Sequence, residues 1–388
     1  MSKPTLAILV NLVAPTRIRL YEHLATAFDV HILHGAMEHN RRSWESPRVQ
    51  GAEVRRVRGW QFQWTERING RPFDSRFLHI ELAYISELLR LRPDAVISLE
   101  MGFRSLVAAA YGAVFGKPVW IWWGGTLHTE CYAGWVKKAL RRCFAGWVKQ
   151  WISYGQTSTE YLLSLGIARE RILQVQNCVD ERLYAFHSVP ALDIEPKPVL
   201  LHVGQMIARK GVAELLNSAA QLQQEGLIFS LVLVGDGPDR NDLESMASRL
   251  ALKNVHFYPA QHAHALSSFY NSCDALVFPT LRDVWGLVAN EAILCGLPVL
   301  CSCYAGCAQE LFDSESIFDP ADHTQFVNGL RKAITGKLPG GDVSRLTTSI
   351  EVGDAIVSAV MKTLGRSASQ TAAAQTDEKT KVAALHGS

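Results

Sequence analysis

Residues 275–292 read ALVFPTLRDVWGLVANEA, which predicts a buried strand, a short loop and a helix that begins near Gly286. A glycine there lets the backbone approach a ligand closely, and the amides of a helix start suit an anion such as phosphate. Asp283 precedes the helix and Glu291 lies within it, so a bound phosphate would have one carboxylate on each side. These could accept hydrogen bonds from sugar and ribose hydroxyls. The alternative is an aspartate that caps the helix and a solvated glutamate.

A second strand-to-helix turn lies in residues 203–211, VGQMIARKG. The strand ends at Gly204, and the adjacent cations Arg209 and Lys210 could neutralise a diphosphate. Two solvated surface charges are the alternative. Residues 231–238, LVLVGDGP, contain only two of the three glycines of a dinucleotide fingerprint, because Arg240 stands at the third position.

Short apolar runs alternate with helical patterns along the whole chain, which indicates parallel strands joined by crossover helices. The pattern restarts after a proline-punctuated stretch at residues 189–198. We therefore expect a first α/β domain at 1–188, a linker at 189–198 and a second domain at 199–345. Residues 346–364 are expected to form a helix that packs back toward the first domain, and 365–388 a disordered tail.

Composition limits the function classes. The 388 residues are 48% hydrophobic and 20% charged, which excludes wholesale disorder and a long coiled coil. A net charge of +2 hides a first half (1–194) at +7 and a second half at −5. The eight cysteines lack paired metal-ligand spacing, and no metal site or nucleic-acid partner is predicted. We expect neither a signal peptide nor a membrane span, and a cytoplasmic location.

Residues 135–151, WVKKALRRCFAGWVKQW, combine a helical apolar period with five Lys and Arg residues and no acid between Trp135 and Trp151. Such a helix could lie on an anionic membrane surface. It could equally be a core helix of the first domain with a solvated basic face, and both interpretations stay open.

Taken together, six blocks between residues 199 and 311 resemble the family 4 retaining glycosyltransferases, which have the GT-B fold. The blocks are VGQMIARKG, VGDGP, FPT, DVWGLVANEA, CGLPVL and AGCAQEL, and residues 177–180, NCVD, resemble a further family segment. The first 150 residues resemble the family much less. The resemblance implies an α/β chain of two Rossmann-like domains, whose parallel sheets face an inter-domain cleft.

The resemblance also implies roles for individual residues. The family's paired acidic residues fall on Asp283, which would contact the donor sugar, and on Glu291, which would contact the ribose. The diphosphate would be bound by cations and by backbone near the two strand ends. The residues implied in this are Gly204, Arg209, Lys210, Trp285, Gly286 and Leu287, with Asp283, Lys210 and Arg209 taken as catalytic.

Departures from the family pattern concern the acceptor side most. Gln205 stands where the family has an arginine, which leaves Arg209 to neutralise charge, and Gly124 stands where a histidine is frequent. Residues 11–17, NLVAPTR, replace a glycine pair. The acceptor-side candidates are Arg17, Glu100 and His128.

The implied activity is retaining, metal-independent transfer of a sugar from a UDP- or GDP-linked donor, without a cofactor. The acceptor would be a glycan or lipid-linked glycan, in exopolysaccharide or lipopolysaccharide biosynthesis at the inner face of the plasma membrane. A non-catalytic nucleotide-sugar-binding protein and a GT-B epimerase are the alternatives.

Overall fold

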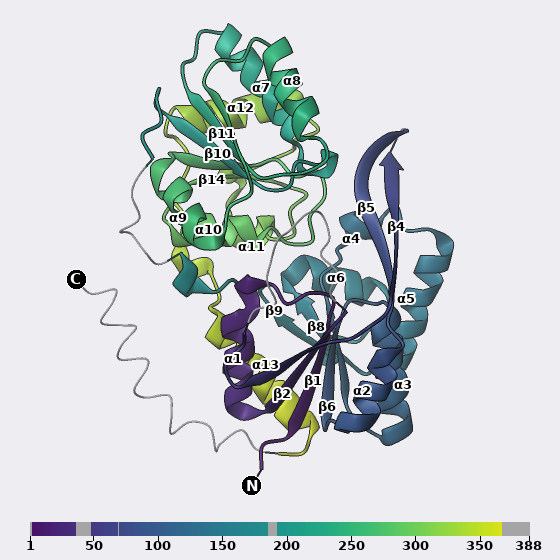
Figure 1. The fold of residues 1–388 in the computed structure, drawn as a ribbon. Coiled ribbons are helices and arrows are strands. Elements are labelled where there is room, and N and C mark those ends of the chain that lie inside the picture. The colour runs from purple at the N-terminus through teal and green to yellow at the C-terminus, as the bar shows by residue number, and fades with distance from the viewer. Residues whose placement is uncertain (1, 36–47, 69, 185–191, 367–388) are drawn as a thin grey trace, which may run out of the picture.

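The computed structural model describes residues 2–35, 48–68, 70–184 and 192–366. The chain forms two α/β domains, each built around a parallel sheet with helices on both faces (Figure 1). The predicted disordered tail falls almost wholly outside the described residues, and so does part of the predicted linker. The two-domain α/β architecture confirms the predicted fold.

The first domain contains a seven-stranded sheet in which every neighbouring pair is parallel. In spatial order the strands are β3 (Ala52–Arg56), β2 (Asp29–His34), β1 (Thr5–Val10), β6 (Ala95–Leu99), β7 (Val119–Trp123), β8 (Gln150–Tyr154) and β9 (Ile172–Val175). The helices are α1 (Ile18–Ala27), α2 (Ala83–Leu91), α3 (Phe103–Phe115), α4 (Leu127–Glu130), α5 (Trp135–Trp147) and α6 (Gly155–Ser164).

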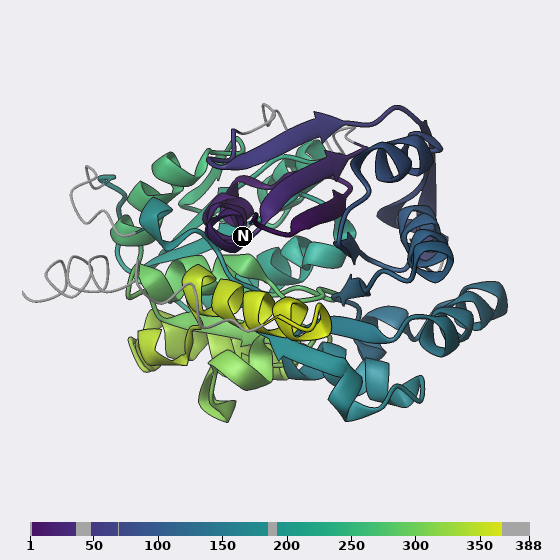
Figure 2. The ribbon, with the colours of Figure 1, turned by 90° about the horizontal axis from the view of Figure 1, so that it is seen from below.

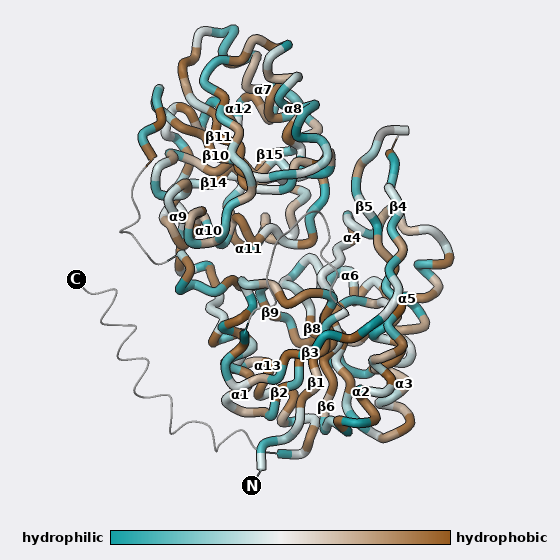
Figure 3. The backbone as a smooth tube through the Cα atoms, viewed as in Figure 1, coloured by the Kyte–Doolittle hydropathy of each residue, from teal (hydrophilic) through white to brown (hydrophobic). Residues whose placement is uncertain are grey.

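Both faces of the sheet's central strands are buried, which explains why β1 and β7 are apolar along their length (Figure 3). On β1, Leu6, Ile8 and Val10 enter one core cluster, while Ala7 and Leu9 enter the cluster on the opposite face. Alternation of side chains along a strand produces this division.

The second domain contains a six-stranded parallel sheet. Its order is β12 (Val255–Tyr258), β11 (Ser230–Val234), β10 (Val199–Val203), β13 (Ala275–Phe278), β14 (Val299–Ser302) and β15 (Ile317–Phe318). The helices are α7 (Val212–Gln224), α8 (Arg240–Arg249), α9 (Ala263–Ser272), α10 (Leu287–Leu294), α11 (Ala308–Leu311) and α12 (His323–Ile334).

The last helix, α13 (Ser349–Thr363), lies against α1 of the first domain (Figure 2). Val352, Ile356 and Val360 are fully or almost fully buried in the same core cluster as Leu20 and Leu24 of α1. The chain therefore returns to the first domain after completing the second.

An antiparallel hairpin, β4 (Trp60–Ile68) and β5 (Arg71–Ile80), projects from the first domain toward the second (Figure 1). It pairs with neither of the parallel sheets. The sequence pattern does not predict this hairpin, although the hairpin supplies contacts to the candidate site.

The predicted helix over residues 135–151 ends at Trp147, so its last four residues were wrongly assigned. Val148 is already extended, and Trp151 lies fully buried in β8, paired with Ile121 of β7. The aromatic residue at 151 fits the apolar helical period but belongs to the sheet.

Candidate functional site

The loop between β13 and α10 has the backbone geometry that a close approach requires. Gly286, the residue before α10, has φ 105° and ψ 69°. A Cβ atom there would lie 2.3 Å from the ring of Phe278. Any side chain would therefore be both strained and overpacked, which accounts for glycine at this position.

Asp283 lies at the centre of this loop and pairs with the cations that follow β10. Its Oδ2 accepts a hydrogen bond from Lys210 Nζ at 2.5 Å and lies 3.9 Å from a terminal nitrogen of Arg209. Burial alone would raise the pKa of Asp283, but Lys210 and Arg209 outweigh that effect and lower it. The structure thus brings together the three residues predicted to be catalytic.

Arg209 connects three parts of the molecule. Its Nε lies 3.1 Å from Oδ2 of Asp74 on β5, and Nη1 donates to the carbonyl of Arg282 at 3.2 Å. Its own carbonyl accepts the backbone amide of Leu281 at 2.8 Å. The turn after β10 and the loop after β13 are therefore held against each other and against the hairpin.

Glu291 lies on α10 and is buried among tyrosines. Tyr270 donates a hydrogen bond to it at 2.7 Å, and Tyr184 donates a second. Burial raises the pKa of Glu291, while the two hydroxyl groups oppose the rise. The structure leaves 6% of this residue exposed. Neither tyrosine was singled out from the sequence.

Trp285 is buried where the second domain meets the first, and a Cβ on Gly155 of α6 would lie 2.5 Å from its ring. Its side chain is fully buried, and Nε1 donates to Asn290 Oδ1 at 2.8 Å. Asn290 Nδ2 in turn donates to the carbonyl of Asn177 at 3.2 Å, in the segment that leads out of the first domain. The predicted donor contact at Trp285 concerns its backbone, which the buried indole holds in place.

Gly204, at the end of β10, packs against the glycine turn that follows β11. A Cβ on Gly235 would lie 1.8 Å from the Gly204 carbonyl oxygen. The glycines of the VGDGP motif therefore serve the close packing of two turns at the carboxyl ends of adjacent strands.

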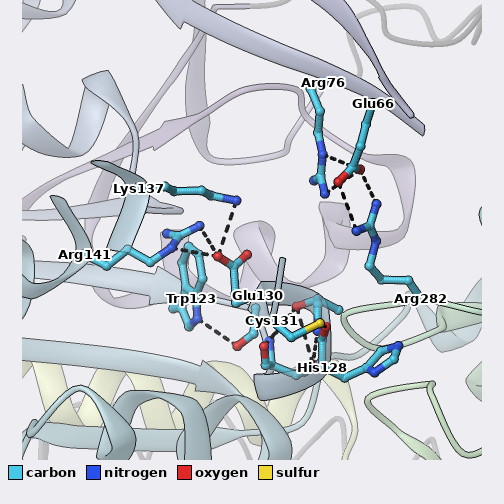
Figure 4. A network of polar contacts seen from close by, with 12 residues as sticks. Glu66, Arg76, Trp123, His128, Glu130, Cys131, Lys137, Arg141 and Arg282 are labelled. Atoms are coloured by element: carbon cyan, nitrogen blue, oxygen red, sulfur yellow. Dashed lines mark hydrogen bonds and ion pairs between the residues drawn. The ribbon is translucent and has the colours of Figure 1, made fainter. Parts of the chain in front are cut away.

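The hairpin adds a second ion pair to the site, on the residue next to Asp283. The guanidinium of Arg282 pairs with both carboxylate oxygens of Glu66 (Figure 4). It also stacks on Phe73, whose ring centroid is 4.6 Å away. Arg76 of β5 also hydrogen-bonds Glu66, at 2.9 Å. No local sequence signal joins residues 66 and 282, so sequence reasoning missed both.

The three acceptor-side candidates differ in their surroundings. His128 reaches across to the second domain, where Nε2 lies 2.9 Å from the Leu281 carbonyl oxygen and the ring stacks on Tyr304. Glu100 is at the carboxyl end of β6 with 71% of its side chain exposed, and Arg104 lies 3.0 Å away. Both residues are at the edge of the first sheet that faces the second domain, and their roles stay predictions.

Arg17 is in the interior of the first domain. It is 8% exposed and lies over the rings of Trp122 and Tyr154, at 4.6 and 5.0 Å. It donates hydrogen bonds to the Tyr154 hydroxyl at 2.7 Å and to Asn177 Oδ1 at 2.8 Å. The structure does not bring Arg17 together with Asp283 and Lys210.

Gly124, which stands where the family has a frequent histidine, has a steric reason to be small. A Cβ at this position would lie 2.4 Å from the Tyr154 ring. The Tyr154 hydroxyl already accepts the hydrogen bond from Arg17. The departure at 124 thus belongs to a local packing arrangement that Arg17 and Tyr154 also form.

The described residues contain neither a metal-binding cluster nor a membrane-spanning helix. No group of three or more His, Cys, Asp and Glu side chains within them is arranged to hold a metal ion. None of the helices formed by these residues has the length and apolar character that crossing a membrane requires.

Sequence similarity to a known family is found mainly in the second domain. Residues 188–344 match the family described as glycosyl transferases group 1. Lipopolysaccharide glucosyltransferase WaaG of Escherichia coli K12 is 33% identical over 146 residues, covering 36% of this chain and 38% of that enzyme. The chain matches two-fifths or less of the length of its curated relatives, which include a capsular polysaccharide glycosyltransferase of Staphylococcus aureus.

Solved structures extend the likeness over the whole fold. HepE of Anabaena, in complex with UDP and glucose, superposes with a TM-score of 0.62 at 16% identity, covering 93% of this chain and 97% of that one. The lipopolysaccharide galactosyltransferase WaaB gives a TM-score of 0.65 at 15% identity, with 92% and 99% covered. Residues 188–344 thus match the group 1 glycosyl transferases, within a chain that has the GT-B fold.

Proposed function

We propose that this chain is a retaining glycosyltransferase of family 4 that transfers a sugar from a UDP- or GDP-linked donor without a metal ion. The observation that carries the proposal is the contact of Lys210 and Arg209 with Asp283, at the carboxyl ends of the adjacent strands β10 and β13. Ligands of open parallel sheets bind at this edge.

The chemistry follows from where charge develops. When the bond between the sugar and the diphosphate breaks, negative charge grows on the departing phosphate. Lys210, Arg209 and the amides that begin α10 would stabilise that charge. Asp283 would accept hydrogen bonds from the sugar, and Glu291 from the ribose. Retention implies attack from the face that the diphosphate leaves, so no separate general base is assigned.

The acceptor class rests on similarity. WaaG and WaaB are lipopolysaccharide glycosyltransferases, and the Staphylococcus aureus relative is a capsular polysaccharide glycosyltransferase. We therefore propose a glycan or lipid-linked glycan as acceptor, in the assembly of a surface polysaccharide, and a cytoplasmic site of action beside the membrane.

The proposal includes contact of α5 with an anionic membrane surface. Its apolar residues Trp135, Val136 and Trp147 are 80%, 60% and 45% exposed. The buried side of the helix contains Arg141, which pairs with Glu130 at 2.6 Å and stacks on Trp123 (Figure 4). Exposed tryptophans beside Lys138 and Arg142 are typical of helices that lie in a bilayer interface.

The experiment that tests the function is a donor screen followed by a transfer assay. UDP-, GDP- and ADP-sugars are added at saturating concentration, and the donor that raises the melting temperature is retained. With that donor and an acceptor extract, the wild-type protein should release free nucleoside diphosphate. Glu291→Ala should abolish that release and leave the fold intact.

A non-catalytic nucleotide-sugar-binding protein is the second candidate, and Gln205 and Gly124 favour it because both depart from the family pattern. Such a protein would be stabilised by the donor in the same screen. It would protect the donor and release no nucleoside diphosphate when the acceptor extract is added.

A further inference from the structure

The hairpin β4–β5 places two carboxylates of the first domain on two cations of the donor loops. Asp74 lies 3.1 Å from Arg209, and Glu66 pairs with Arg282. The side chains of these four residues are 5–20% exposed. Interactions between charges at such depth are screened less by salt than those between surface charges.

Arg209 is held by Asp74 through charge rather than through an aligned hydrogen bond. Within the described structure its Nε is buried and has no hydrogen-bond partner, although the Asp74 carboxylate is within ion-pair distance. A guanidinium has a planar fork that suits bidentate oxyanions. Arg209 is therefore neutralised where it stands, yet part of its hydrogen-bonding capacity is not used by Asp74.

The charges around the donor loops are already largely compensated. Four cations, Arg76, Arg209, Lys210 and Arg282, face the three carboxylates of Asp74, Glu66 and Asp283. A nucleotide diphosphate would add about two further negative charges to this group. Asp283 is part of the donor loop after β13 and therefore stays with these cations. Asp74 and Glu66 are on the hairpin, which is a separate element.

We propose that the Asp74 carboxylate takes the place beside Arg209 that the donor diphosphate would otherwise take. The hairpin is then an electrostatic latch that donor binding releases. The inference rests on the proposed function, because it takes Arg209 as a diphosphate ligand. Docking of the hairpin and binding of the donor compete for one cation, and by linkage each must weaken the other.

The hairpin is a two-stranded element separate from both parallel sheets. A two-stranded ribbon is marginally stable by itself and depends on what it packs against. On β4 the aromatic side chains of Trp60, Phe62 and Trp64 are 62%, 54% and 53% exposed, so little apolar surface fixes the hairpin. Its contacts with the second domain include the two ion pairs and the stacking of Phe73 on Arg282.

The test is calorimetric titration of the full chain with UDP and with GDP, combined with hydrogen exchange of residues 60–80. The variants are Asp74→Asn, which removes the competing charge, and Asp29→Asn as the matched control. Asp29 pairs with His31 at the amino end of β2, the sheet edge opposite to the donor loops. Asp74→Asn should bind the nucleotide about threefold more tightly or better, and Asp29→Asn should bind as the wild type does.

In the wild type, the nucleotide should speed amide exchange in residues 60–80, and in Asp74→Asn that exchange should be fast already. Equal or weaker binding by Asp74→Asn would overturn the latch and show that Asp74 orients Arg209 instead. Unchanged exchange in the wild type would overturn it too. If the wild type binds neither nucleotide, the proposed function and the latch both fail. If it binds and Asp74→Asn binds no better, only the latch fails.

Discussion

Lys210 Nζ and Asp283 Oδ2 lie 2.5 Å apart although 73 positions separate them in the sequence. They meet because β10 and β13 are adjacent parallel strands, and each residue follows the carboxyl end of its strand. The pair is the central feature of the proposed donor site, and it also makes stability depend on pH.

The pKa of Asp283 is lowered in the folded protein, which determines the direction of that dependence. The native state binds fewer protons there than the unfolded state, so the stabilisation is present above the ordinary value of 3.8 and lost as the pH falls through the lowered pKa. Asp283→Asn should therefore reduce stability at pH 6 and flatten its loss in acid. Urea denaturation at pH 6, 5, 4 and 3 measures this. An acid limb as steep as in the wild type would contradict the pairing.

Gly286→Ala should destabilise the second domain by about 2–4 kcal/mol, because the new methyl group meets Phe278 at a backbone conformation that alanine adopts poorly. Chemical denaturation measures the loss. Gly340→Ala is the matched control, because a Cβ there meets nothing within 4 Å. Equal stability of the two variants would refute the close packing at Gly286.

Arg17→Met should destabilise the first domain by about 2–3 kcal/mol, since it leaves Tyr154 and Asn177 without their charged donor in a buried setting. Arg58→Met, at an exposed position, should change stability little. Thermal melts measure both. If Arg17→Met kept the wild-type melting temperature but lost transfer, the acceptor role predicted for Arg17 would be supported over the packing role.

The membrane proposal predicts that α5 controls binding to vesicles. Replacing Trp135 and Val136 by alanine should lower co-sedimentation with phosphatidylglycerol-containing vesicles several-fold, and Lys138→Glu with Arg142→Glu should abolish its dependence on anionic lipid. Ile228→Ala, 69% exposed in the second domain, is the control. If co-sedimentation of the wild-type protein did not depend on lipid composition, the membrane proposal would be refuted.

The second domain was predictable because its motifs are local. The strand, loop and helix in residues 275–292 follow one another in sequence. Lys210 and Asp283 each follow the carboxyl end of a strand, and a parallel sheet topology favours placing these two strands side by side. The contacts of Asp74 and Glu66 were not predictable. Each joins the hairpin to a residue of the other domain, and Glu66 lies 216 positions from Arg282. No periodicity encodes such a pairing.

The helix α5 shows a different limit. Periodicity indicates which residues share a face, but not which face meets the core. Arg141 is buried because Glu130 and Trp123 neutralise and stack on its guanidinium, while Trp135 remains exposed. Those partners come from α4 and β7, outside the periodic segment at residues 135–151.

The most direct test of the central claim is the release of nucleoside diphosphate by Lys210→Ala, measured with the stabilising donor and an acceptor extract. Loss of the ammonium should slow release by about 100-fold or more, because the charge developing on the leaving diphosphate loses a principal counterion. Lys253→Ala, at an exposed turn of the same domain, should retain the wild-type rate. Near wild-type release by folded Lys210→Ala would contradict the account, since it would remove the Lys210–Asp283 pair from the reaction.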